Sequence, residues 1–370
     1  MAKKSRIRRI GKKIFLILQL LLTFLFLYPL FIKPLPFIWI NGFLGLLAPY
    51  IVIAQLLLFI FWLLAKPWLS LIPLLTLVIG WETLFSLVAW HPGMSMAQKK
   101  KEDICRVISW NVKGFNGNQA TSTLKLRTQD IAYSIQKWNP DIICMQEYNT
   151  NDRPNDIANH ATYFNKNYPY NYFSKDIQIA DKSYFLGCII FSKYPIIKAQ
   201  RIAYTNQESL IYVDLLRGDD TIRVFTTHLA SYRFKENDFI ALAATADANA
   251  IDINGKKGVL RKMRNAFVER AVQAQTVKKY LDESPYPSII TGDFNDVPSS
   301  YTYKTIKGDW SDSFLEKGFG IGASYLGISP TLRIDYILSN ASWKTKGWES
   351  LDENLSDHHM IMADLQLIKN

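Results

Sequence analysis

Residues 288–296, SIITGDFND, decide how the second half of the chain folds. The stretch opens with apolar and β-branched side chains, which favour a buried strand. Asp293 and Asn295 follow at once, so a carboxylate and an amide stand where the strand ends. A single carboxylate after a strand usually lies in a solvated turn or caps a helix. The pattern indicates a functional site only if it recurs along the chain.

The same pattern recurs along the chain. Each copy is an apolar strand with an acid, an amide or a histidine at or near one end, and none carries a nucleophilic Ser or Cys motif or a glycine-rich phosphate loop. Carboxylate and amide oxygens are ligands that suit Mg²⁺ or Mn²⁺. The further copies are SWN ending at Asn111, QE at Glu147, VFTTH at His228, RIDYIL with Asp335, and SDHH with Asp357 and His358.

Strands and helices alternate from Ile104 onward, which predicts one α/β domain over residues 103–370. The first unit is strand–helix–strand: a strand at 104–110, a helix facing inward through Ile131 and Ile135, and a strand at 141–147. An amphipathic helix is predicted over 265–283. Further strands are predicted at 186–191, 211–216, 221–227, 287–292, 333–338 and 360–367.

Three apolar runs fill most of the first ninety residues, and Glu82 is their only charged residue. A helix needs about 20 mainly apolar residues to cross roughly 30 Å of hydrocarbon, so each run is long enough. We therefore expect a basic tail at 1–13, a membrane anchor at 14–90 and a polar linker at 91–102. The three transmembrane helices are predicted at 14–32, 43–65 and 68–90.

The net charge of +11 lies entirely in residues 1–101, which leaves residues 102–370 neutral. Affinity for nucleic acid comes largely from basic groups on phosphates, and the domain as a whole does not supply them. The basic tail and Lys66 put eight positive charges on one side of the anchor, against four on the other. The positive-inside rule predicts a multi-pass protein of the inner (cytoplasmic) membrane, its amino terminus cytoplasmic and its folded domain periplasmic or extracellular.

The ordered set SWNVKGFN, ICMQEY, TTHL, TGDFND, RIDYIL and SDHH resembles the endonuclease/exonuclease/phosphatase (DNase I-like) superfamily over residues 104–367. The resemblance implies a four-layer sandwich, in which two mixed β-sheets pack together and helices cover both outer faces. With the anchor in front, the chain looks like a membrane-anchored bacterial branch of that superfamily.

The resemblance also implies a divalent metal site, with Mg²⁺ or Mn²⁺ as the cofactor. Glu147 matches the principal metal ligand, and Asn111 and Asp357 match residues beside the metal or the phosphate. A metal held by carboxylates acts as a Lewis acid and as a template for the substrate.

The remaining motif residues match catalytic and substrate-binding groups. Asp293 matches the acid that positions or deprotonates the attacking water, and Asn295 helps to hold phosphate and nucleophile. His358 matches the histidine on the scissile phosphate, and Asp335 its orienting carboxylate. His228 matches a second histidine that contacts phosphate or assists the leaving group.

The predicted activity is therefore metal-dependent hydrolysis of a phosphodiester or phosphomonoester, with a lipid headgroup or another membrane-associated phosphate ester as substrate. A membrane-tethered nuclease acting on DNA or RNA is the alternative, and a non-catalytic binding module is a third. The sequence points to no protein partner. It leaves open whether His358 or His359 is the catalytic imidazole, and whether the basic segment 233–264 is a lid or a solvated helix end.

Overall fold

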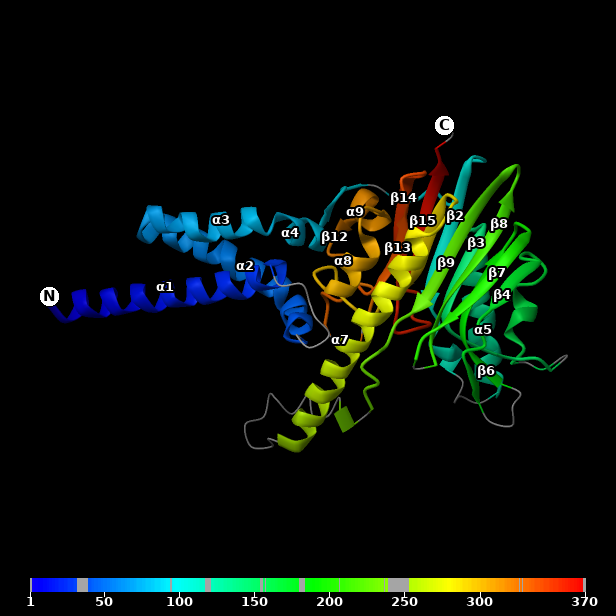
Figure 1. Cartoon of the computed structure of the whole chain (residues 1–370), viewed down its shortest axis with the longest axis horizontal. Coiled ribbons are helices and arrows are strands. Elements are labelled where there is room, and N and C mark those ends of the chain that lie inside the picture. Colours follow the sequence, from blue (N-terminus) through cyan, green and yellow to red (C-terminus); the bar gives the residue numbers. More distant parts are fainter. Residues whose placement is uncertain are drawn as a thin grey trace. The chain divides into compact units, whose positions relative to one another are not determined.

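The computed structural model describes two compact units, Met1–Leu87 with Pro298–Tyr301, and Val88–Val297 with Thr302–Asn370. Figure 1 shows the elements of both units. The described residues are 2–31, 39–93, 95–116, 121–153, 156, 158–179, 184–205, 207–235, 237–238, 253–325, 327 and 329–368.

The amino-terminal unit is built from apolar helices. The helices α1 (Ala2–Phe31) and α2 (Ile40–Ala65) each contain a stretch long and apolar enough to cross a membrane. The basic tail predicted at 1–13 is not separate from the first span, because α1 runs through it. Residue 32, the last of the first predicted span, lies outside the described residues.

The prediction of a third continuous transmembrane helix at 68–90 is wrong. That run folds as a 3₁₀ turn η1 (Pro67–Ser70), α3 (Leu71–Ile79) and α4 (Trp81–Leu87), with a 69° bend, and its last residues form a strand. Gly80 stands at the bend, and a Cβ there would lie 2.1 Å from the ring of Phe26. The close approach of that ring to the Gly80 backbone requires the glycine, which also weakens the helix locally.

Polar side chains bond to one another inside this apolar unit. Gln19 Nε2 of α1 donates to Gln55 Oε1 of α2 over 2.5 Å, and the hydroxyls of Thr23 and Thr76 lie 3.0 Å apart. Gln19 and Gln55 are fully buried, as is nearly all of Thr76. The network therefore joins α1, α2 and α3. Its polar groups lie in apolar surroundings, where few other hydrogen-bond partners are within reach.

The second unit contains two large mixed sheets. The described strands of the seven-stranded sheet run in the order β14 (Trp343–Leu351), β15 (Met360–Leu367), β2 (Ile104–Asn111), β3 (Ile142–Asn151), β6 (Tyr184–Ser192) and β4 (Tyr170–Phe173), with β5 (Ile177–Ile179) also on β6. The six-stranded sheet runs β11 (Ser311–Asp312), β13 (Asp335–Ser339), β10 (Ser288–Asp293), β9 (Asp220–His228), β8 (Ser209–Arg217) and β7 (Ile196–Ala203).

Short elements complete this unit. The strands β1 (Ala89–Trp90) and β12 (Phe319–Gly320) pair with each other. The helices are η2 (Lys113–Asn116), α5 (Thr121–Gln136), η3 (His160–Tyr163), α7 (Ile253–Asp282), α8 (Tyr301–Lys307) and α9 (Ser313–Lys317).

Three apolar clusters hold the layers together. The sheets pack face to face through side chains such as Val107 and Ile142 on one and Ile211 and Ile289 on the other. Strand β2 is buried along its whole length, as expected for a strand covered on both faces.

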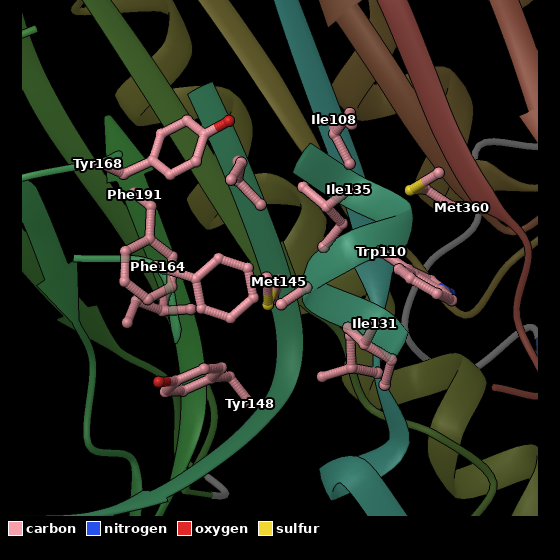
Figure 2. Packing of buried hydrophobic residues seen from close by; sticks show 14 of the residues in the cluster. Ile108, Trp110, Ile131, Ile135, Met145, Tyr148, Phe164, Tyr168, Phe191 and Met360 are labelled. Carbon is pink, nitrogen blue, oxygen red and sulfur yellow. The ribbon is translucent and has the colours of Figure 1, made fainter. Parts of the chain in front are cut away.

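Helices cover the outer faces of both sheets. Ile131 and Ile135 of α5 pack on the seven-stranded sheet beside Ile108 and Met145 (Figure 2). Side chains of α7 and α8, including Ala274, Val277, Leu281, Tyr303 and Ile306, pack on the six-stranded sheet. The four-layer α/β sandwich predicted from the sequence is confirmed.

Candidate active site

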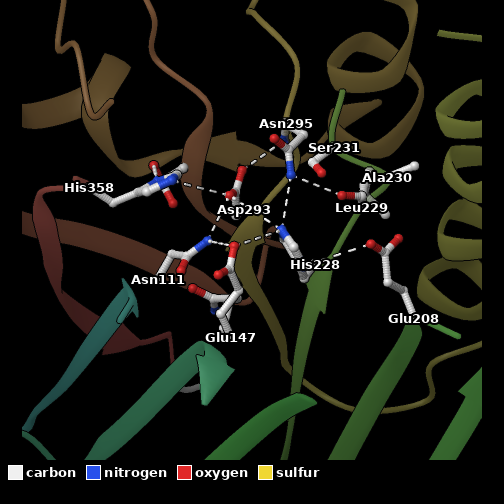
Figure 3. Close-up of polar contacts among 12 residues, drawn as sticks. Asn111, Glu147, Glu208, His228, Leu229, Ala230, Ser231, Asp293, Asn295 and His358 are labelled. Atoms are coloured by element: carbon white, nitrogen blue, oxygen red, sulfur yellow. Dashed lines mark hydrogen bonds and ion pairs between the residues drawn. The ribbon is translucent and has the colours of Figure 1, made fainter. Parts of the chain in front are cut away.

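Polar residues from both sheets meet at one edge of the sandwich (Figure 3). Asn111 ends β2 and Glu147 lies in β3, whereas His228 ends β9 and Asp293 ends β10. Asp335 begins β13, and His358 lies two residues before β15 begins. Because the last two strands run antiparallel to their neighbours, their starts lie at the same edge as the ends of the other four.

Glu147 lies at an irregularity in β3. The pairing of β3 with β6 shifts register between Met145 and Tyr148, and Glu147 has φ 49°. A bulge of this kind turns a side chain out of the regular alternation, and non-glycine residues adopt positive φ only where the surroundings enforce it. The carboxylate consequently reaches Asn111, whose Nδ2 donates to Glu147 Oε1 over 3.0 Å.

Asp293 lies between its two neighbours in the six-stranded sheet. It pairs with His228 on β9 and with Asp335 on β13. The preceding Gly292 has φ 148°, and a Cβ there would lie 2.1 Å from the carbonyl oxygen of Thr227. Only glycine permits this approach of β10 to β9, which fixes where the Asp293 carboxylate lies.

Asn111 joins the carboxylates of the two sheets. Its Nδ2 donates to Glu147 Oε1 and, over 3.1 Å, to Asp293 Oδ2. Its Oδ1 accepts the backbone N–H of Lys113 over 3.0 Å. The sequence predicted Asn111 as a metal ligand, but here its amide nitrogen faces the two acids and its oxygen is engaged elsewhere.

His358 and Asp335 form a buried pair. Nδ1 of His358 donates to Asp335 Oδ2 over 2.9 Å, and its Nε2 lies 3.7 Å from Asp293 Oδ2. Burial lowers the pKa of His358, but the carboxylates of Asp335 and Asp293 outweigh burial and raise this pKa to about 10. The imidazole is therefore cationic at neutral pH. His359 bonds instead to Ser350 through Nδ1, so of the two histidines the structure brings His358 to the site.

His228 faces both Glu147 and Asp293, with its Nε2 3.7 Å from an oxygen of each. Asn295 Nδ2 lies 3.0 Å from this nitrogen, to which it can donate when the ring is neutral, and it donates to the carbonyl oxygen of Leu229 over 2.9 Å. Burial by itself lowers the pKa of His228, and Glu208, Asp293 and Glu147 together raise it above its usual value.

Sequence reasoning missed Glu208, which lies just before β8 with one oxygen 4.0 Å from Nδ1 of His228. Burial raises the pKa of Glu208, and the facing His228 and Arg233 oppose that rise. Glu208 stands in no motif, and only the pairing of β8 with β9 brings it to His228.

Lys113 was missed as well. Its Nζ lies 2.8 Å from Asp357 Oδ2, so Asp357, which the sequence predicted at the metal, is paired with an ammonium. The one-letter pattern shows a lysine two positions after Asn111, but nothing in it indicates that the side chain reaches Asp357.

The basic segment predicted at 233–264 lies partly outside the described residues, which omit 236 and 239–252. Its described end, 253–264, forms the first turns of α7. Lys262 of that helix bonds to Asp238. The described part of the segment is therefore the end of a helix, which was one of the two alternatives that the sequence left open.

A divalent cation is compatible with the acids at this edge. Asp293, Asp335 and His358 offer ligand atoms within 4.8 Å of one another, but His358 and Asp335 are already bonded to each other. Glu147 and Asp293 share only the amide of Asn111, and the Glu147 side chain is 35% exposed. These two carboxylates are the better oxygen donors for a hard cation.

The model of the Endonuclease/Exonuclease/phosphatase family matches residues 108–358, more than half of the chain. The chain belongs to this family. Its membership confirms the predicted resemblance and the prediction of an enzyme that hydrolyses phosphate esters. The model of a Domain of unknown function (DUF8431) matches residues 12–87. No curated protein matches the chain.

Several solved structures are similar to this Endonuclease/Exonuclease/phosphatase domain. A humanized D. rerio TDP2 with 14 mutations is 17% identical and aligns over 71% of this chain and 99% of its own, with a TM-score of 0.50. The human Nocturnin catalytic domain with bound sulfate is 16% identical over 71% of this chain and 93% of its own, with a TM-score of 0.49. Sphingomyelinase C from Streptomyces griseocarneus is 17% identical and aligns over 70% of this chain and 99% of its own, with a TM-score of 0.46.

Proposed function

We propose that the chain is a membrane-anchored phosphoesterase that depends on Mg²⁺ or Mn²⁺ and hydrolyses a phosphodiester or phosphomonoester by in-line attack of water. The observation that carries the proposal is the meeting of Glu147, Asp293 and His358 at one sheet edge, with Nε2 of His358 3.7 Å from Asp293 Oδ2. Glu147 and Asp293 would hold the cation, which would neutralise phosphate charge and orient the substrate.

Asp293 is the residue we assign to the attacking water. Its Oδ1 accepts the backbone N–H of Asn295 over 2.8 Å, and its Oδ2 accepts from Asn111. These bonds fix the carboxylate so that it meets a water in one orientation. A carboxylate held in reach of water as a general base contributes typically about 10²–10⁴-fold to the rate.

The two histidines serve the phosphate. Asp335 holds Nδ1 of His358, so the Nε2–H of the imidazolium is left to donate to a nonbridging oxygen. A fixed cationic donor stabilises the charge that develops there. His228, which Asn295 and Glu208 orient from opposite sides, would assist the leaving oxygen as a proton donor once its ring is protonated.

A first experiment tests the activity with the full-length protein in detergent. We expect hydrolysis of bis(p-nitrophenyl) phosphate or p-nitrophenyl phosphate with Mg²⁺ or Mn²⁺, and loss of turnover in EDTA that added Mg²⁺ restores. Glu147→Gln should remove the activity. Glu283→Gln, at an exposed acid at the end of α7, should not. Equal turnover with and without EDTA would refute the metal dependence.

The apolar helices support attachment to a bilayer. Ile10–Leu30 and Ile40–Ala65 have mean hydropathies of 2.0 and 2.4 and span 21 and 26 residues. We expect the full chain to stay in the membrane fraction after alkaline carbonate extraction. Release into the supernatant would contradict anchoring.

The side of the membrane on which the enzyme acts depends on the bent pair η1–α3 and α4. The basic tail favours a cytoplasmic amino terminus of an inner-membrane protein. Two crossings would return the chain to the cytoplasm, and a third through the bent pair would put the catalytic unit on the periplasmic or extracellular side. Reporter fusions after Lys66 and after Asn370 distinguish these arrangements.

Anchoring favours a substrate that is itself held at the membrane, such as a phospholipid headgroup. The neutral charge balance of residues 102–370 agrees with this, because a nuclease needs a basic surface. Sphingomyelin, inositol phosphates, plasmid DNA and RNA should be compared in one assay. Cleavage of DNA or RNA without turnover of the lipid would make the protein a tethered nuclease instead.

A further inference from the structure

Lys113 stands in an unusual turn directly after Asn111. Lys113, Gly114 and Phe115 all have positive φ, at 48°, 58° and 52°. Lysine and phenylalanine adopt this left-handed conformation only at a cost, and such residues cluster at functional sites. Two non-glycine residues with positive φ within three positions need a structural cause.

The surroundings hold the turn in place. The ring of Phe115 is fully buried, with its centroid 4.2 Å from that of His160 and 5.6 Å from that of Tyr148. The N–H of Lys113 is bound by Asn111 Oδ1, and the N–H of Phe115 by the carbonyl oxygen of Val112 over 2.9 Å. A buried anchor on one side and a site residue on the other thus fix the position of the Lys113 backbone.

This position brings the ammonium to Asp357. Nζ of Lys113 lies 2.8 Å from Asp357 Oδ2, and the two side chains are 51% and 28% exposed. The neighbouring Ser356 donates to the carbonyl oxygen of Asn111 over 2.7 Å, which ties the segment before β15 to the same turn. The Lys113–Asp357 contact therefore lies between two segments that a second hydrogen bond also holds together.

The pair changes the charge balance of the site. Among the described residues, five acids lie at this edge. Asp335 has the cationic His358 in direct contact and Asp357 has Lys113, while one oxygen of Glu208 lies 4.0 Å from Nδ1 of His228. The other two are Glu147 and Asp293, which share the neutral amide of Asn111 and lie 3.7 Å from an imidazole nitrogen, too far for a hydrogen bond. Two carboxylates balance one divalent cation.

We propose that the Lys113 ammonium pairs with Asp357 and thereby keeps this carboxylate from binding a metal ion. The active site then binds one divalent cation, through Glu147 and Asp293. The inference rests on the proposed metal-dependent function. It assigns Asp357 to the lysine rather than to the metal, and it makes Lys113 the residue that sets the number of metal ions.

Calorimetric titration of the full-length protein in detergent with Mn²⁺ tests the number of ions. We expect one ion per chain in the wild type and none in Glu147→Gln. Lys113→Met keeps the length of the side chain and removes its charge, so the freed Asp357 should bind a second ion. The double variant Lys113→Met/Asp357→Asn should return to one. Circular dichroism spectra verify that each variant is folded.

Lys137→Met is the matched control, because Lys137 forms a comparable pair with Glu353, Nζ to Oε1 2.7 Å, away from the catalytic acids. It should keep one ion. Two ions in the active wild type, or one ion in a folded Lys113→Met, would overturn the role of Lys113 and leave the hydrolase intact. No Mn²⁺ binding and EDTA-resistant turnover in the wild type would instead overturn the metal dependence itself.

Discussion

His228 and Asp293 occupy paired positions on the parallel strands β9 and β10, and Nε2 of the imidazole lies 3.7 Å from Oδ2 of the carboxylate. The pairing depends on Gly292, since any side chain at that position would meet the carbonyl oxygen of Thr227. A backbone contact thus sets the distance between two groups of the active site.

Gly292→Ala should therefore damage both stability and catalysis. The added methyl group meets Thr227 O at 2.1 Å, and overpacking of this kind typically costs about 1–3 kcal/mol. A shift of Asp293 by about 1 Å would lower kcat by roughly 10²-fold. Thermal unfolding and kcat with bis(p-nitrophenyl) phosphate measure the two effects.

Gly218→Ala is the control for Gly292→Ala. Gly218 also has a positive φ, 62°, but nothing lies within 4 Å of the added Cβ. It should lose only about 1 kcal/mol of stability and keep its kcat. Equal losses in the two variants would show that strain at positive φ, and not the contact with Thr227, is the cause.

His358→Gln should lower kcat by about 10²–10⁴-fold, because it removes the cationic donor that Asp335 holds. His359→Gln changes the adjacent residue, which bonds to Ser350, and should leave kcat close to that of the wild type. Steady-state kinetics of both purified variants give the comparison. The reverse order would mean that His359 is the catalytic imidazole.

Glu208→Gln should lower the pKa of His228, because the carboxylate is the largest of the charges that raise it. If a protonated His228 assists the leaving group, kcat at neutral pH should fall by roughly tenfold. Histidine ring resonances measured by NMR against pH report the pKa directly. Glu269→Gln, an acid of α7 that faces Arg233, is the control and should shift the pKa of His228 less.

An unchanged pKa of His228 in Glu208→Gln would show that Glu208 does not act on it. A lowered pKa with unchanged kcat would separate the electrostatic contact from catalysis.

His160 should make the fold sensitive to acid. Burial lowers its pKa to about 4, although the carbonyl oxygen of Asn149, 2.5 Å from Nδ1, and Asp156 favour the charged form. Because this pKa is depressed, the unfolded chain binds the proton more readily below about pH 6.5. The stability that His160 contributes is thus complete above pH 6.5 and is lost as the pH falls toward 4.

The expected loss is about 2 kcal/mol between pH 7.5 and pH 5. His160→Phe keeps a ring against Phe115 but cannot titrate, so it should show a smaller loss over the same range. Unfolding curves of both proteins at the two pH values give the difference. Equal pH dependence in the two would contradict a depressed pKa.

The sequence predicted the strands that are buried on both faces and missed those at the edges. β2, β3 and β10 each contain a run of buried apolar residues, and they were predicted within one residue at the start and four at the end. The edge strands β7 and β14 carry exposed lysines, as in IIKAQRIA and WKTKGWESL, and their sequences do not differ from those of polar loops. Edges often carry charges of this kind, which prevent pairing with other chains.

Local sequence also fails where a distant contact decides the outcome. The hydropathy of residues 68–90 predicted one continuous helix, because hydropathy carries no information about the packing of Phe26 on Gly80. The helix predicted at 265–283 begins twelve residues earlier, at Ile253. Lys113 and Glu208 reach the site through a left-handed turn and through strand pairing, and neither has a signature in its own neighbourhood.

The bond between Gln19 and Gln55 has a consequence for how the apolar helices assemble. If the two helices span a bilayer as proposed, a slide of either helix by one turn would leave both amides facing hydrocarbon without a partner, which is costly. The helices therefore recognise one another in a single register. Exchanging them for generic hydrophobic segments would preserve insertion but abolish that pairing, so the amino-terminal region is a folded module in its own right.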